Sequence, residues 1–313
     1  MYRNRQHTFR QVETSFSLCY CVPCEKHYGR YDMIQCTGIE KSYTDKKVLS
    51  GISFDIPDGQ IFGLLGPSGA GKTTLIKILT GQLAFDGGSA MILQKNVRHL
   101  TGEDKKKIGI MMDQFGVYER LSCYDNLKVF ADIYGTPKEK IMETLRLVGL
   151  EDSAKKPASS LSKGMRVRLQ LARVFMVSPE IIFLDEPTTG LDPMTMKQIH
   201  RIILDKKKHG CTIFLTTHNM EEAAKLCDTV ALLNEGVIVD TGAPEEICRR
   251  FNHQKKIVLH LKNGEDRELA HSKESAAEIS KLLEEEKVET IHSSEPTLET
   301  VFLELTGRKL EEE

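Results

Sequence analysis

One glycine-rich run restricts the possible folds of this chain more than any other feature. It reads GPSGAGKT from Gly66 to Thr73 and fits the pattern G-x-x-x-x-G-K-[ST]. Glycines let backbone N–H groups curl around phosphate oxygens, the lysine neutralises phosphate charge, and the hydroxyl can bind Mg²⁺. The run therefore predicts a phosphate-binding loop.

The flanking residues have the patterns that such a loop requires. Residues 60–65 form a short apolar run typical of a strand, and residues 74–79 have helical spacing without Gly or Pro. The order of strand, glycine loop and helix favours a phosphate site over an incidental glycine-rich turn. The candidate phosphate-binding residues are Gly66, Pro67, Ser68, Gly69, Ala70, Gly71, Lys72, Thr73 and Thr74.

A second run supplies acidic side chains. Residues 181–184 are apolar, as in a buried strand, and Asp185 and Glu186 follow directly. A carboxylate at Asp185 can hold the Mg²⁺ shell, and one at Glu186 can polarise a water molecule. Together with the glycine loop, the pair predicts a site that hydrolyses ATP.

Composition excludes several general modes of action. The 313 residues are enough for one large domain and a smaller appendage. Lys and Arg total 43 against 45 Asp and Glu, and this balance gives no general attraction to nucleic acid or anionic lipid. No stretch approaches the ~18 apolar residues that span a bilayer. If the protein acts at a membrane, another chain is expected to cross it.

The cysteines fall into two groups. Four are scattered along the chain: Cys123, Cys211, Cys227 and Cys248. We expect these four to be reduced core thiols, because an ATP-consuming site implies the cytoplasm, where disulfides are rare. The other four, Cys19, Cys21, Cys24 and Cys36, lie near the start of the sequence. The first three have the spacing C-x-C-x2-C, but they lack the second pair that a typical metal site would have.

The order of patterns predicts an α/β fold. Residues 33–39 and 48–56 alternate like antiparallel strands that would lie over the nucleotide site, and residues 121–149 have helical periodicity. Strand and helix patterns alternate from residue 181 to residue 233, as in a right-handed parallel β-α-β series. After residue 251, short strand and helix patterns predict a small α+β appendage.

The segment LSKGM at residues 161–165 decides the family. It belongs to an ordered set that resembles the ATP-binding cassette (ABC) ATPases across residues 33–251: Tyr43, the phosphate loop, Gln114, LSKGM, LDEP, Gly190-Leu191-Asp192 and His218. The resemblance implies a P-loop NTPase core with a mixed sheet and flanking helices, an antiparallel β subdomain and a helical subdomain at about 115–178. Residues 252–313 would form a C-terminal accessory domain.

The resemblance also implies roles for residues at matching positions. Tyr43 would stack on adenine, Lys72 would hold phosphates, and Thr73, Gln114 and Asp185 would contact Mg²⁺. Glu186 would be the general base, and His218 would contact the γ-phosphate. Two copies of the chain would bind two ATP molecules head to tail, with Ser162 and Gly164 of one copy reaching the ATP of the other. The expected cofactors are therefore ATP and Mg²⁺.

Two features point to a subgroup of this family. The usual signature LSGGQ has Lys163 and Met165 here, and similar variants occur in cassettes of bacterial drug, antibiotic-peptide and sodium exporters. Residues 295–308 resemble the closing segment of those cassettes. We expect Lys163 to point to solvent, and the apolar stripe of residues 297–305 to pack on the C-terminal appendage.

The resemblance predicts the ATPase subunit of an exporter, which dimerises on Mg-ATP and drives a separate transmembrane permease. It would lie on the cytoplasmic face of the membrane and contact the permease through residues 115–124. A non-transport ATPase acting on ribosomes or DNA is the main alternative. Only about 90 residues, without sustained heptads, separate the phosphate loop from LSKGM, which disfavours a DNA-repair type with coiled coils. A nucleotide-binding regulator without catalysis is disfavoured because the acidic pair and Lys72 are intact.

Residues 1–32 are basic and lack clear periodicity, whereas a strand-like pattern starts at Met33. A secretory signal is disfavoured because residues 15–22 are short for its apolar region, and a disordered tail is a second alternative. Our hypothesis is that Met33 is the initiator, so that residues 1–32 are a non-native extension. Mass spectrometry of the natively expressed protein should then find an N-terminus at Met33. Peptides from residues 1–32 would contradict the hypothesis.

Overall fold

The computed structural model describes residues 32–44, 46–112, 116–252, 256–294 and 296–307. The predicted N-terminal extension, apart from Asp32, and Gln114 lie outside these residues. In the described part of the chain, every helix is too short or too polar to cross a membrane.

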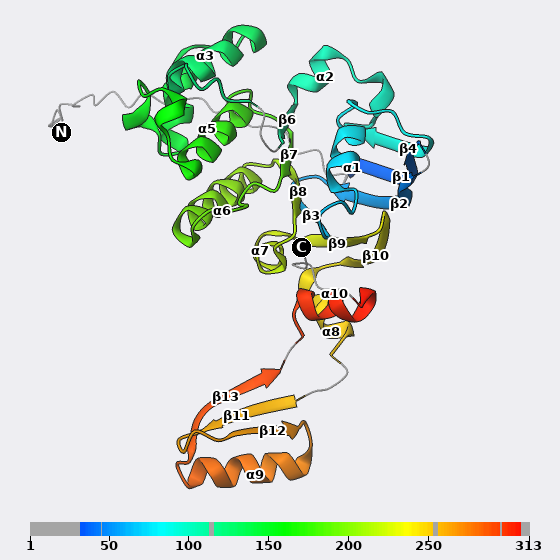
Figure 1. The fold of residues 1–313 in the computed structure, drawn as a ribbon, viewed down its shortest axis with the longest axis vertical. Helices are drawn as coiled ribbons and strands as arrows, with labels where there is room; N and C mark the ends of the chain where they lie inside the picture. Colours follow the sequence, from blue (N-terminus) through cyan, green and yellow to red (C-terminus); the bar gives the residue numbers. More distant parts are fainter. Residues whose placement is uncertain (1–31, 45, 113–115, 253–255, 295, 308–313) are drawn as a thin grey trace, which may run out of the picture. The chain divides into compact units, whose positions relative to one another are not determined.

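A six-stranded sheet with the order β10-β9-β3-β8-β7-β6 forms the centre of the fold (Figure 1). Its strands are β3 (Ile61–Leu65), β6 (Ile108–Met111), β7 (Ile181–Asp185), β8 (Thr212–Thr217), β9 (Thr229–Asn234) and β10 (Val237–Gly242). All neighbours are parallel except β9 and β10. The buried strands are nearly continuous apolar runs because both faces of the sheet are covered. The predicted α/β fold with a mixed sheet is confirmed.

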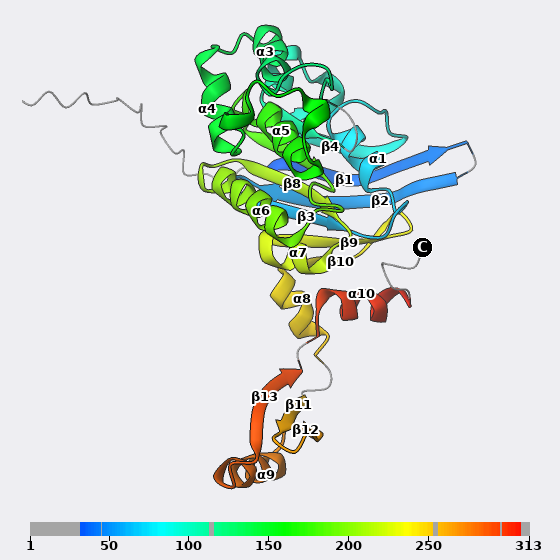
Figure 2. The same cartoon turned by 60° about the vertical axis from the view of Figure 1, so that its left-hand side comes forward.

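The two faces of this sheet are covered by different elements (Figure 2). One face packs against the helices α5 (Lys163–Phe175), α6 (Pro193–Lys208) and α7 (Met220–Leu226). The other face packs against α1 (Lys72–Leu79) and a second sheet with the order β2-β1-β4-β5. Successive strand residues therefore point into two separate cores.

The second sheet is the predicted antiparallel subdomain. Its strands are β1 (Asp32–Tyr43), β2 (Lys46–Pro57), β4 (Gly87–Ile92) and β5 (Lys95–Asn96). Each neighbouring pair is antiparallel. The strands expected at 33–39 and 48–56 are confirmed, and both are longer than their alternating patterns indicated.

Local signals fix where the main helices begin. Ser162 accepts a hydrogen bond from the backbone N–H of Met165 at the start of α5, and Asn219 accepts one from Glu222 at the start of α7. Asp192 caps α6, whose first residue is Pro193. Ser162 and Asn219 are both residue types that favour the N-cap position of a helix. The region before α5 is mostly helical and contains α3 (Cys123–Tyr134) and α4 (Glu139–Leu147), whereas the short helix α2 (Gly102–Lys106) lies before β6.

The C-terminal region contains a three-stranded antiparallel sheet and a helix. They are β11 (Lys256–Leu261), β12 (Asp266–Ala270), β13 (Val288–Ser294) and α9 (Lys273–Glu284). Leu259, Leu261 and Leu282 form a small core between this sheet and α9. The predicted α+β appendage is therefore present.

The last helix, α10 (Leu298–Thr306), packs differently from our expectation. Leu298, Val301 and Phe302 are buried in the large core that contains α7 and α8 (Pro244–Arg250). The expectation that this helix packs on the appendage is wrong, because α9 already covers the apolar side chains of the small sheet. Neither β10 nor α8 was predicted. The strand β10 alternates between exposed and half-buried residues at the edge of the sheet, so its sequence signal is weak.

The cysteine environments agree in part with the expected core thiols. Cys123 and Cys227 are buried, whereas Cys211 and Cys248 are half-buried. Burial raises the pKa of the Cys227 thiol far above its ordinary range and that of Cys36 to about 12. These buried thiols are therefore protonated and unreactive near neutral pH.

The aromatic contacts beneath the antiparallel sheet generate a stability prediction. Phe214 lies within 5.4–5.9 Å, centroid to centroid, of Phe54, Phe62 and Phe183. Phe214→Ala should lower the free energy of unfolding by about 3–5 kcal/mol, because it leaves a cavity between two sheets. Urea unfolding measures the effect, with Ile133→Ala as a control because Ile133 is 65% exposed. Equal stabilities of the two variants would contradict this description of the core.

Candidate active site

The phosphate loop runs from the end of β3 to the start of α1, as predicted. A Cβ at Gly66 would lie 2.2 Å from the carbonyl oxygen of Leu233, so no larger residue fits there. Gly71 caps α1 with φ +111°, and a Cβ there would lie 2.7 Å from Leu49 Cδ2. These glycines let the loop curve tightly between the two sheets.

A cavity of about 260 Å³ opens beside this loop. It is lined by Val48, Pro67, Ser68, Gly69, Gly71, Lys72, Thr73, Thr74, Asp185 and Glu186. The N-terminus of α1 contributes backbone N–H groups and the positive end of the helix dipole. The cavity therefore has the chemistry of an anion site, and the predicted acidic pair forms its wall.

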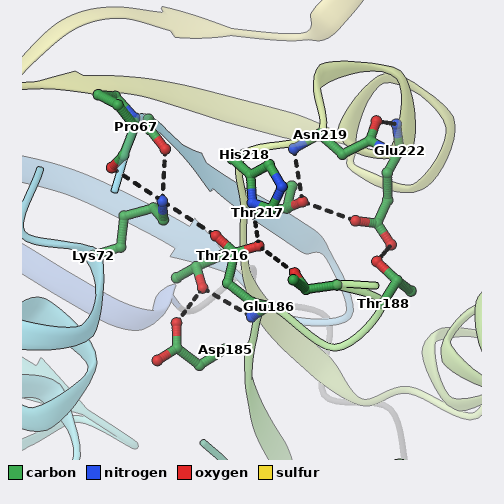
Figure 3. A network of polar contacts seen from close by, with 12 residues as sticks. Pro67, Lys72, Asp185, Glu186, Thr188, Thr216, Thr217, His218, Asn219 and Glu222 are labelled. Carbon is green, nitrogen blue, oxygen red and sulfur yellow. Dashed lines mark hydrogen bonds and ion pairs between the residues drawn. The ribbon is translucent and has the colours of Figure 1, made fainter. Parts of the chain in front are cut away.

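Lys72, the first residue of α1, is buried and folded into the loop (Figure 3). Its Nζ donates hydrogen bonds to the carbonyl oxygens of Gly66 at 2.6 Å and Pro67 at 3.3 Å. The same ammonium lies 3.2 Å from Glu186 Oε1. One cation thus joins the phosphate loop to the residue that follows β7.

Two oxygen-bearing side chains suit a magnesium ion at this site. The hydroxyl of Thr73 donates to Asp185 Oδ2 at 2.8 Å, and the hydroxyl of Thr216 donates to Asp185 Oδ1. Mg²⁺ prefers few protein oxygens and completes its shell with water and phosphate oxygens. Within the described ranges, no cluster of three or more His, Cys, Asp or Glu could hold a metal ion by itself. The Thr73–Asp185 pair therefore fits a magnesium ion that arrives with a nucleotide.

Glu186 has an unusual backbone and three side-chain partners. Its φ is +50°, a left-handed conformation that costs a non-glycine residue on the order of 1–3 kcal/mol. Its backbone N–H bonds to the carbonyl oxygen of Thr216 at 3.1 Å. Its Oε2 accepts a hydrogen bond from the hydroxyl of Thr189 at 3.0 Å and lies 2.8 Å from His218 Nδ1. With the Lys72 contact, the carboxylate is held on both oxygens.

His218 follows the last residue of β8, and β8 is the direct neighbour of β7. Adjacent parallel strands end at the same edge of a sheet, which brings His218 and Glu186 together. Because an ionised carboxylate only accepts hydrogen bonds, Nδ1 of His218 carries the proton in this contact. The Nε2 atom is then left to face another group.

Several predicted residues lie apart from this cavity. Tyr43 at the end of β1 is 45% exposed and does not line the cavity. Val48 of β2 does line it. Ser162 and Gly164 at the start of α5 do not line the cavity of their own chain. Gln114 lies outside the described residues. The adenine, signature and glutamine roles therefore stay predictions.

Lys163 is exposed, as expected, yet its ammonium does not simply extend into solvent. A Cβ at Gly190 would lie 2.3 Å from Lys163 Nζ, so the ammonium rests against this glycine. Lys163 also lines a second cavity of about 350 Å³ together with Asp185 and Glu186. Sequence reasoning also missed Thr216, which contacts both acidic residues. The sequence indicated Thr216 only through the two threonines that follow the apolar residues of β8.

Comparison with known proteins agrees with this geometry. The family model described as ABC transporter matches residues 49–189. A fluoroquinolones export ATP-binding protein of Mycobacterium tuberculosis is 39% identical over 285 residues, covering 89% of this chain and 95% of that protein. The linearmycin resistance ATP-binding protein LnrL of Bacillus subtilis is 32% identical over 309 residues, covering 89% of this chain and 99% of that protein.

Solved structures show the same cassette fold. The structure of cbiO1 from Clostridium perfringens, part of the ABC transporter complex cbiONQ, matches with a TM-score of 0.63 and 28% identity. The match covers 69% of this chain and 90% of that one. The resemblance expected from the sequence is confirmed: this chain belongs to the ATP-binding subunits of ABC transporters, a family of ATPases.

Proposed function

We propose that this protein is the ATP-hydrolysing subunit of an exporter and drives a separate membrane permease. The single observation that carries the hydrolytic part is the contact of Glu186 with Lys72 and His218 at the wall of the phosphate cavity. Relatives named for fluoroquinolone export and linearmycin resistance support the exporter part. No observation on the described residues favours the alternative of a ribosome- or DNA-acting ATPase.

In this proposal, the phosphate loop binds ATP through its backbone N–H groups and the ammonium of Lys72. Thr73 and Asp185 would hold Mg²⁺, with Gln114 as a further contact implied by the family resemblance. The bound ion would neutralise charge on the phosphate oxygens. Tyr43 would stack on the adenine, and Val48 supplies an apolar part of the cavity wall.

Glu186 would act as the general base. Its carboxylate accepts a proton from the attacking water, whose oxygen forms a bond to the γ-phosphorus. The bond between the γ-phosphorus and the bridging oxygen breaks, and its electron pair leaves with ADP. The Nδ1–H of His218 holds the carboxylate in place, which leaves Nε2 for the γ-phosphate.

The signature residues support a complete site made by two copies. Ser162 and Gly164 begin the 13-residue helix α5, yet neither lines the phosphate cavity of its own chain. The N-terminus of such a helix favours a phosphate group through its N–H groups and its dipole. A head-to-tail dimer would place this end on the ATP of the second copy.

The proposed permease surface is residues 115–124, of which the structure describes residues 116–124, at and just before the start of α3. Tyr118 is 53% exposed there. The buried side chain of Asn126 accepts a hydrogen bond from the Tyr118 N–H at 2.7 Å and donates to the carbonyl oxygens of Tyr118, Leu121 and Ser122. This segment therefore presents an exposed tyrosine, a residue type enriched at binding hot spots, on a backbone that Asn126 holds through hydrogen bonds. The subunit would then sit on the cytoplasmic face of the membrane.

Glu186→Gln tests the hydrolytic role. The amide cannot accept the proton of water, so turnover should fall by at least ~100-fold, the lower end of the range for general-base catalysis. ATP binding and ATP-dependent dimerisation should persist because Lys72 and the loop are unchanged. Steady-state ATPase assays and light scattering measure the two properties, with Glu221→Gln as an exposed acidic control. Turnover at the wild-type rate in the Glu186 variant would remove Glu186 as the base.

A further inference from the structure

A second buried glutamate lies behind the proposed catalytic pair. Glu222 belongs to α7, and its side chain has no exposed surface. A buried carboxylate is costly unless hydrogen bonds replace its hydration. The neighbouring Glu221 shows the ordinary arrangement, because it is exposed and pairs with Lys225 one turn along the same helix. Glu222 therefore needs an explanation that Glu221 does not.

Three side chains from three separate elements bind the Glu222 carboxylate. Thr188, in the turn after β7, donates its hydroxyl hydrogen to Oε1 at 2.6 Å. Thr217, the last residue of β8, donates to Oε2 at 2.8 Å. His200 of α6 places Nε2 2.9 Å from Oε1. The carboxylate is thus a common acceptor for a turn, a strand end and a helix.

Two of these donors lie next to the proposed catalytic residues (Figure 3). Thr188 is two residues after Glu186, and Thr217 directly precedes His218. The network closes on itself, because the N–H of Asn219 donates to Thr217 Oγ1 at 3.0 Å and the N–H of Glu222 donates to Asn219 Oδ1 at 2.9 Å. The segment that carries Glu186 and the segment that carries His218 are therefore tied to the same carboxylate.

The backbone of Glu186 explains why such a tie is needed. Its left-handed conformation persists only where the surrounding structure enforces it. A loop that relaxed from it would move the carboxylate away from His218 Nδ1 and from Lys72. A displacement of about 1 Å at a reacting group can cost about 100-fold in rate.

We propose that Glu222 is a positioning residue: it fixes the turn after Glu186 and the strand end before His218 so that the two side chains stay in contact. The inference rests on the proposed roles of Glu186 and His218. Glu222 does not line the phosphate cavity, so it acts on the catalytic pair and leaves ATP binding unchanged. His200 extends the same network to α6.

Glu222→Gln is the direct test, with Glu221→Gln as the matched control on the same helix. The glutamine keeps the size of the side chain but replaces one acceptor oxygen by a donor, so one threonine hydroxyl can no longer donate to it. The kcat for ATP should fall about 10- to 100-fold, by analogy with the loss when an outer-shell hydrogen-bond partner of a metal ligand is removed. The KM for ATP should stay within about twofold, because the phosphate loop is untouched.

Thr188→Val provides a second test that keeps Glu222 and the volume of the side chain. It removes only the hydroxyl donated to Oε1, so it should lower kcat in the same direction with an unchanged KM. The double variant should lose less than the product of the two single effects, because both substitutions act on the same carboxylate network. If Glu222→Gln fails to fold, the kcat and KM of Thr188→Val alone decide whether the inference holds.

A kcat like that of the Glu221 control in these variants would overturn the inference, and so would a raised KM with an unchanged kcat. Failure of the proposed function has a different signature. An inactive wild-type protein, or an active Glu186→Gln variant, would remove the catalytic pair itself, whatever the behaviour of Glu222.

Discussion

The carboxylate of Glu186 is the contact on which the site depends. It meets the ammonium of Lys72 at 3.2 Å and the imidazole of His218 at 2.8 Å, so it joins the start of α1, the end of β7 and the end of β8. More than a hundred residues separate Lys72 from Glu186. Only the strand order of the central sheet brings these segments together, since β3, β8 and β7 are direct parallel neighbours.

That sheet also holds the site residues in a defined arrangement. Its strands are buried on both faces, by helices on one side and by α1 with the antiparallel sheet on the other. The polar ends of β7 and β8 then meet at one edge, where Thr216 donates to Asp185 and Thr217 to Glu222. Buried and fully partnered carboxylates hold a defined geometry, whereas an unpartnered one would be expelled to water.

Local signals made most of the fold and the centre of the site predictable. The phosphate loop, the acidic pair and the caps at Ser162 and Asn219 depend on neighbouring residues, so the sequence carries them directly. The packing of α10 and the lining of the cavity depend on residues far apart in the sequence. For this reason, the expectation that α10 packs on the C-terminal appendage was wrong, and Tyr43 is absent from the cavity lining. The sequence did not indicate a role for Glu222. Glu221 and Glu222 are adjacent glutamates in the first turn of α7, and the sequence alone does not show which of them is buried.

Recovery of a membrane partner tests the central claim most directly, because ATP chemistry alone does not distinguish a transporter subunit from other cassette ATPases. A tagged wild-type chain purified from solubilised membranes should bring down a protein with several membrane spans. Tyr118→Asp should lose that protein, whereas Leu283→Asp, which changes a similarly exposed side chain on α9, should keep it. Recovery of ribosomes or DNA without any membrane protein would contradict the account.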